Sequence, residues 1–88
     1  MGPIRGGIEM TKKMVKLIFP QELIKEPVTF RMATQFDVIP NIRRANVTET
    51  VGELILELEG EHERIEKGIE YLTKLGVRVE PIVGDIVE

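Results

Sequence analysis

Apolar and polar residues alternate along the segment from residue 53 to residue 60. Leu54, Leu56 and Leu58 occupy every second position, and most of the residues between them are glutamates. A period of two is typical of a β-strand with one buried face and one face in water. Gly60 is expected to end this strand. The segment therefore predicts a long amphipathic strand in the second half of the chain.

From Glu61 onward the spacing of the apolar residues becomes that of a helix. Four of them recur at this spacing: Ile65, Ile69, Leu72 and Leu75. Glu61 stands at the start, where the helix dipole favours negative charge. Gly76 follows the last apolar position, where a left-handed residue commonly ends a helix. Residues 77–80 alternate again and predict a short strand that ends at Pro81.

The first half of the chain shows the same succession of patterns. Residues 15–19 alternate and predict a strand that stops at Pro20. Pro27 suits the first turn of a helix, because the N–H that it lacks would have no partner there. One apolar stripe follows at helical spacing and consists of Val28, Met32, Ala33 and Phe36. The helix is expected to end near Asp37, and a second strand is expected at 41–47.

The predicted order of elements is β-α-β-β-α-β, which defines an α+β fold. Two right-handed βαβ units joined by a hairpin form a ferredoxin-like sandwich. This fold is a four-stranded antiparallel sheet, of order 4-1-3-2, with two helices on one face. The apolar strands at 15–19 and 54–58 then lie in the centre. The strand at 41–47 becomes an edge, where Arg43 and Arg44 are tolerated.

The folded part is predicted to be one domain at residues 14–82. Residues 1–13 are expected to be a flexible tail, because their first seven positions hold three glycines and a proline without any period. Residues 83–88 are interpreted as a C-terminal tail or a truncated linker. With 42% hydrophobic and 31% charged residues, the chain has the composition of a folded globular domain.

Composition also excludes several classes of function. The chain has no cysteine, so no thiolate metal site or disulfide is expected. A net charge of −3 argues against nucleic acid as a partner. No apolar run approaches the ~20 residues of a membrane span, so no direct insertion into a membrane is expected. The single histidine, His62, has no nucleophile in its sequence context, and the chain offers no second histidine and no cysteine to complete a metal site. We therefore expect no catalysis, no metal and no cofactor.

Several short motifs, in this order and spacing, resemble the NIL domain family across residues 14–82. They are Leu17-Ile18-Phe19-Pro20, Pro27-Val28, Phe36-Asp37-Val38, Asn41-Ile42 and Gly76-Val77-Arg78-Val79-Glu80. The family is named after Asn-Ile-Leu, and Asn41-Ile42-Arg43 differs at the third position. NIL domains are best known as paired regulatory domains of methionine ABC importer ATPases. The resemblance implies a cytoplasmic, non-catalytic domain that binds methionine or a related amino acid at a homodimer interface, with an ABC transporter as partner.

A second group of NIL domains is joined to small ferredoxins. Arg43-Arg44-Ala45 and Gly84-Asp85-Ile86-Val87 resemble that group. The alternative hypothesis is therefore a ligand-free module that docks a ferredoxin or a sulfur-transfer enzyme.

The resemblance implies a ligand pocket between the end of the first helix and the start of the second strand. Its candidate residues are Asn41, Ile42, Met32, Phe36, Val38 and Arg43. In this hypothesis the Asn41 amide meets the polar groups of the ligand, and Arg43 or Arg44 binds its carboxylate. Structural roles are open for the same residues: Asn41 as the start of an edge strand, the two arginines as a solvated edge, and Met32 and Phe36 as core.

Overall fold

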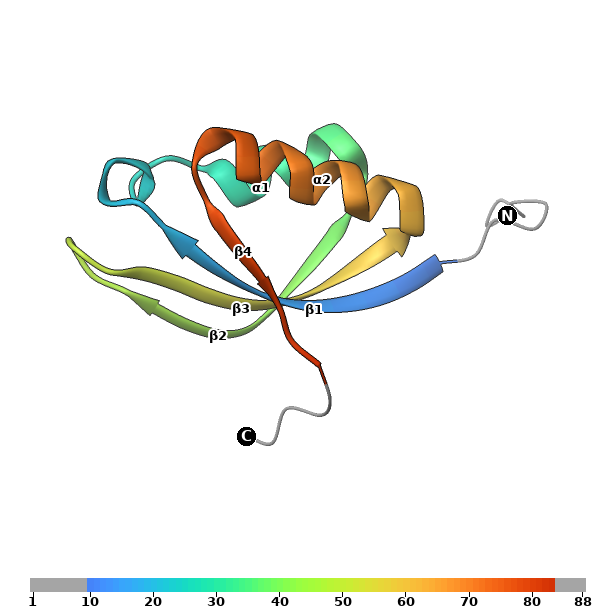
Figure 1. Ribbon diagram of the computed structural model, residues 1–88, viewed down its shortest axis with the longest axis horizontal. Helices are drawn as coiled ribbons and strands as arrows, with labels where there is room; N and C mark the ends of the chain where they lie inside the picture. The colour runs from blue at the N-terminus through green and yellow to red at the C-terminus, as the bar shows by residue number, and fades with distance from the viewer. Residues whose placement is uncertain (1–9, 84–88) are drawn as a thin grey trace.

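The structure, a computed structural model, describes residues 10–83; residues 1–9 and 84–88 lie outside the described part. The elements follow the predicted order, with one additional 3₁₀ turn. They are β1 (Met10–Phe19), η1 (Gln21–Leu23), α1 (Val28–Phe36), β2 (Ile39–Val47), β3 (Gly52–Glu61), α2 (His62–Leu75) and β4 (Arg78–Pro81). Both helices lie on the same face of the sheet (Figure 1). The predicted α+β, ferredoxin-like arrangement is confirmed.

The sheet is antiparallel and its strands lie in the order β2-β3-β1-β4. This is the predicted order 4-1-3-2 read from the other edge. β1 and β3 form the centre and pair along ten residues, with Val15 opposite Leu56 and Leu17 opposite Leu54. Within residues 10–83, β2 pairs only with β3, and β4 pairs only with β1, so both are edge strands.

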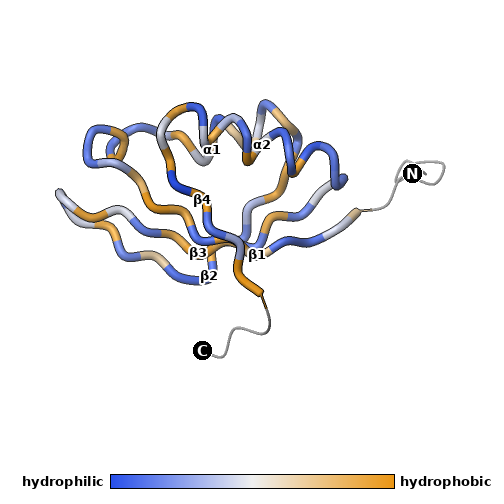
Figure 2. The backbone as a smooth tube through the Cα atoms, viewed as in Figure 1, coloured by the Kyte–Doolittle hydropathy of each residue, from blue (hydrophilic) through white to orange (hydrophobic). Residues whose placement is uncertain are grey.

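The core lies between the sheet and the two helices. Ten apolar side chains are buried: Val15, Leu17, Val28, Met32, Val38, Leu56, Leu58, Ile65, Leu72 and Val77. Figure 2 shows the corresponding alternation of hydrophobic and hydrophilic stretches along the strands and helices. The sequence patterns identify most of this core, while Phe19, Leu54, Ile69 and Val79 are only partly buried against it.

The two helices approach closely where Met32 of α1 meets Gly68 of α2. A Cβ atom at Gly68 would lie 2.9 Å from the Met32 sulfur, which is too close for an ordinary contact. Next to this point the rings of Phe36 and Tyr71 pack with their centroids 5.5 Å apart and tilted by 59°. Such a tilted geometry is favourable for two aromatic rings. Together, the small residue and the ring pair position α1 against α2.

The structure extends β1 to four residues that the sequence assigns to a tail. The predicted tail at 1–13 needs correction at its end, because residues 10–13 belong to β1. They pair with Leu58–Glu61, so β3 also continues past Gly60. The Thr11 hydroxyl donates to the Gly60 carbonyl at 3.2 Å. Both extensions have one cause, since each strand end gives the other its hydrogen-bond partners.

Neither helix of the described part has the length of a membrane span. α2 is the longer one at 14 residues, against the ~20 apolar residues that are required.

The central position of Leu56 gives a direct test of the fold. Leu56 is fully buried, so we expect Leu56→Ala to lower the free energy of unfolding by about 2–5 kcal/mol. Urea denaturation of both proteins measures this difference. Leu75→Ala deletes the same atoms at a side chain that is 42% exposed, and should cost about 0.5 kcal/mol or less. Equal costs for the two variants would contradict the assigned core.

Candidate functional site

The main candidate site is an open hollow between the outer side of α1 and the first half of β2. Its volume is about 670 Å³. It is lined by Thr29, Phe30, Ala33, Thr34, Asp37, Val38, Ile39, Pro40 and Ile42. We call it the α1–β2 hollow. It lies where the sequence places the ligand pocket, between the end of the first helix and the start of the second strand.

The wall of the α1–β2 hollow is apolar although it faces water. Phe30 is 68% exposed, Ile39 is 55% exposed and Ile42 is 56% exposed. These residues come from two elements and line one depression, with Ile42 on the side of β2 that faces the helices and Ile39, which pairs with Glu59, on the side of Asn41. Isolated apolar side chains are common on protein surfaces, but a cluster of them indicates a binding surface.

The polar side chains of the wall differ in whether they already have a hydrogen-bond partner within the described part of the protein. The Thr34 hydroxyl donates to backbone carbonyls of its own helix, at 3.0 Å to Phe30 and 3.2 Å to Arg31. Its hydroxyl group is therefore already engaged. Asp37 is exposed, and no hydrogen bond or ion pair holds its carboxylate within the described residues. The hollow thus combines an apolar surface with one free negative charge.

Two of the six predicted ligand residues line the α1–β2 hollow, namely Val38 and Ile42. Met32 is fully buried in the core, and Phe36 packs partly buried against it and against Tyr71. The structure therefore places Met32 and Phe36 behind the wall of the hollow, where they support α1.

Asn41 and Arg43 lie on β2 beside the hollow but do not line it. The neighbours of Asn41 in the strand, Pro40 and Ile42, pair with buried residues of β3, whereas Asn41 pairs with Glu57. Side chains alternate along a strand, so the Asn41 amide faces the side of the sheet that the helices leave uncovered. Arg43 is the extra residue of a β-bulge between Ile42 and Arg44.

Sequence reasoning did not identify the most exposed wall residue, Phe30. This residue lies outside the apolar stripe that the helix buries, which is itself a usable signal. A large aromatic residue outside the buried face of a short helix contributes little burial to the core. Such a residue indicates a surface site. Ile39 was missed for another reason, because the strand was expected to begin two residues later.

Comparison with known proteins identifies the family to which this chain belongs. The model of the NIL domain family matches residues 13–81. The chain belongs to the NIL domain family. This family assignment agrees with the resemblance seen in the sequence motifs.

The segments that match this NIL domain belong to longer proteins. The methionine import ATP-binding protein MetN 1 of Listeria monocytogenes is 33% identical over 76 residues, which cover 82% of this chain and 22% of that protein. MetN 2 of Acinetobacter baylyi is 37% identical over 68 residues, covering 73% and 20% respectively. This chain therefore spans about a fifth of the length of the curated relatives that it matches.

A solved structure shows the same fold. The C-terminal domain of an ABC transporter ATP-binding protein from Enterococcus faecalis superimposes with a TM-score of 0.74 at 34% sequence identity. The match covers 83% of this chain and 86% of that one. This NIL domain is thus similar, over most of its length, to the C-terminal domain of such an ATP-binding protein.

A second, smaller cleft of this NIL domain lies between the start of α1, the end of β2 and the start of β3. Its volume is about 140 Å³, and Phe30 forms part of its wall as well as part of the α1–β2 hollow. Gly52 lies at its base, where a Cβ atom would come within 3.0 Å of Ile24 and 3.2 Å of Phe19. A side chain at position 52 would therefore press on Ile24, which follows η1, and on Phe19 of β1, and these neighbours would have to shift.

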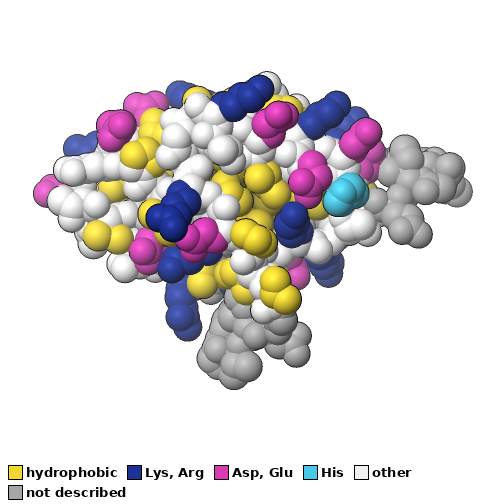
Figure 3. Space-filling view, viewed as in Figure 1, with side chains coloured by type: hydrophobic (Ala, Val, Ile, Leu, Met, Phe, Trp, Pro, Cys, Tyr) yellow, Lys and Arg dark blue, Asp and Glu magenta, His cyan; other side chains and the backbone are white. Residues whose placement is uncertain are grey.

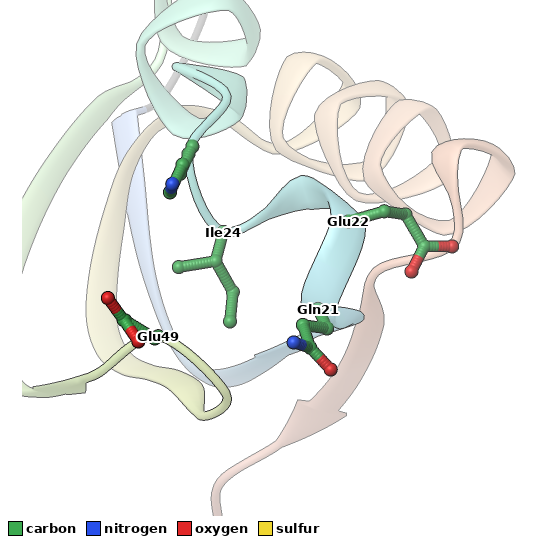
Figure 4. Close-up of a pocket in the computed structure, with 5 residues that line it drawn as sticks. Gln21, Glu22, Ile24 and Glu49 are labelled. Carbon is green, nitrogen blue, oxygen red and sulfur yellow. The ribbon is translucent and has the colours of Figure 1, made fainter.

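A third depression lies between η1 and the turn that joins β2 to β3 (Figure 4). It is lined by Gln21, Glu22, Ile24, Lys25 and Glu49. In Figure 4, the side chains of Glu22 and Glu49 lie on opposite sides of it and do not converge on one point. The two carboxylates therefore do not form a pair that could hold a metal ion between them.

Charged side chains cover the surface over α2 (Figure 3). Exposed ion pairs connect Lys74 with Glu70 at 4.0 Å and Lys13 with Glu66 at 3.1 Å. Pairs of this kind contribute little to stability. Within residues 10–83, no three histidine, aspartate or glutamate side chains gather as a metal site would require. The charge pattern of α2 is that of a solvated face.

Proposed function

We propose that this NIL domain is a regulatory domain that binds methionine, or a related apolar amino acid, in the α1–β2 hollow. The observation that carries the proposal is the cluster of exposed apolar side chains Phe30, Ile39 and Ile42 around one depression. The relatives supply the ligand class, since they are methionine import ATP-binding proteins. An ATP-binding subunit of an ABC importer is accordingly the proposed partner.

The α1–β2 hollow suits a small apolar side chain energetically. Full burial of a side chain of the size of methionine contributes about 1.5–3 kcal/mol. The charged amino and carboxylate groups must meanwhile exchange part of their hydration for protein contacts. We therefore expect a dissociation constant between about 10 μM and 1 mM. Such weak binding suits a sensor of a metabolite that is abundant when uptake should stop.

We further propose that a second copy of the chain completes the site. β2 is an edge strand of nine residues, and Ile39, Ile42 and Val47 are all more than half exposed on it. A long exposed edge with apolar side chains favours pairing with another strand. A two-fold axis beside β2 would pair two such edges.

The dimer hypothesis gives Asn41 a role in ligand binding. Within one chain, strand β2 lies between the Asn41 amide and the α1–β2 hollow. In the proposed dimer the two-fold axis runs along β2, which turns the partner's sheet over and brings the second Asn41 to the side of the strand on which the hollow lies. Its amide can both donate to a carboxylate and accept from an ammonium group. This is why the ligand site and the dimer interface are proposed at the same strand.

The ligand hypothesis is tested by calorimetry and thermal shift with millimolar methionine. We expect heat of binding and a raised melting temperature for the natural protein. Asn41→Ala should abolish both effects and leave the melting temperature of the ligand-free protein unchanged, because Asn41 is exposed. Asn46→Ala is the matched control: Asn46 lies on the same strand, is also exposed, and faces the same side beside Glu53. It should bind methionine normally.

Methionine, homocysteine and cysteine should be tested in parallel. The absence of heat and of stabilisation with all three would contradict the sensing function. It would favour the alternative, a ligand-free module that docks a ferredoxin or a sulfur-transfer enzyme.

The dimer is tested by light scattering at about 50 μM protein. We expect a mass of twice the 10.0 kDa of one chain. Ile42→Lys should reduce this mass toward that of the monomer, since it places a charge in the proposed interface. Leu75→Lys, at an exposed apolar residue on α2, should not. A monomeric mass for the natural protein would exclude the β2 dimer at this concentration.

A further inference from the structure

α1 ends differently from α2, and the difference lies at the α1–β2 hollow. α2 has Lys74 in its last turn and Gly76 after it, with a φ angle of 108°. A basic residue complements the negative end of the helix dipole, and glycine adopts the left-handed conformation without strain. α1 has no basic residue in its last turn, and Asp37 occupies its left-handed position at φ 57°.

Asp37 therefore carries two local costs. It is the one non-glycine residue with a positive φ angle among residues 10–83, a conformation that aspartate adopts more readily than most residues but less readily than glycine. Its carboxylate also lies at the negative end of a helix, where negative charge is unfavourable. Asparagine or glycine would avoid the second cost, and both tolerate the first. Stability of the helix end alone does not account for a carboxylate here.

The position of Asp37 indicates that its carboxylate takes part in binding at the hollow. Asp37 lines the α1–β2 hollow, and among its described lining residues only Asp37 carries a charge. The other wall residues are apolar side chains and the two threonines. Nothing in the described part of the chain neutralises the carboxylate by an ion pair. The hollow thus presents an apolar surface with a single unpaired anion, which is complementary to an apolar molecule with one cationic group.

We infer that the Asp37 carboxylate accepts the ammonium group of the ligand, so that the hollow selects small apolar amines and not apolar acids. This inference rests on the proposed function, because it assigns the recognition of one group of the proposed ligand. The amino acid's own carboxylate then lies away from Asp37, toward solvent or the partner copy. Hydrogen bonds between oppositely charged groups are the stronger ones, so loss of either member weakens binding measurably.

The experiment compares three ligands by calorimetry on the natural protein. Methionine carries both charged groups, methioninol keeps the ammonium group without the carboxylate, and N-acetylmethionine keeps the carboxylate without the ammonium group. We expect methioninol to bind within about threefold of methionine and N-acetylmethionine to bind at least about tenfold more weakly. Equal affinity for methionine and N-acetylmethionine would overturn the inference.

Two variants test the residue itself. Asp37→Asn and Asp37→Gly remove the charge and keep residues that tolerate the left-handed conformation, so both proteins should fold with an unchanged or slightly raised melting temperature. Each should bind methionine and methioninol about five- to tenfold more weakly. Glu59→Gln is the control: Glu59 pairs with Ile39 in the sheet but does not line the hollow, so it should bind normally.

The outcomes separate this inference from the proposed function. If the natural protein binds methionine but Asp37→Asn binds it equally well, the role of Asp37 is wrong and the proposed function stands. If the natural protein binds neither methionine nor methioninol, the proposed function fails and the inference fails with it.

Discussion

The pairing of β1 with β3 determines where every other element of this domain lies. The two strands pair along ten residues, so that Val15 and Leu17 of one share a face with Leu54 and Leu56 of the other. A shift of one residue in the register would turn the apolar side chains of one of the two strands toward water. The buried face must then be covered, and α1 and α2 cover it from one side (Figure 1). β2 and β4 are added at the outside, each with one neighbour.

The candidate site follows from what this arrangement leaves uncovered. α1 has nine residues, and its buried face uses Val28 and Met32. Phe30 lies off that face and points its ring at solvent, next to the exposed start of β2. An edge strand with apolar side chains and a helix with an exposed aromatic ring form a surface that is unfavourable in water. A ligand, a second copy of the chain, or both would remove it from water.

Much of the fold is predictable from the sequence because burial imposes strict periods. The alternation around Leu56, the helical spacing around Ile65 and the glycine at position 76 each specify one local structure, and the structure contains all three. The beginning of β1 was not predictable, since Lys12 and Lys13 show no pattern and become a strand only by pairing with β3. Gly60 was predicted to end the β3 strand, but the strand continues to Glu61 because it pairs there with the start of β1.

The candidate site was harder to predict than the fold. The sequence predicts a pocket between the end of the first helix and the start of the second strand, and two of its six candidate residues, Val38 and Ile42, line the hollow found there. It does not reveal which side of a strand faces the hollow, because that depends on pairing with β3. For this reason Asn41 lies on the opposite side of β2, and Met32 lies in the core. The role of Asp37 becomes visible only when the end of α1 is compared with the end of α2.

The most direct measurement of the central claim locates the ligand on the protein. Methyl-resolved NMR spectra recorded during a methionine titration should show shifts of the Ile39 and Ile42 methyl groups, which line the α1–β2 hollow. The methyl groups of Ile55, on the uncovered face of the sheet, and of Ile65, in the core, should remain unshifted. Shifts at Ile24, in the cleft beside β3, without shifts at Ile39 and Ile42 would contradict the account.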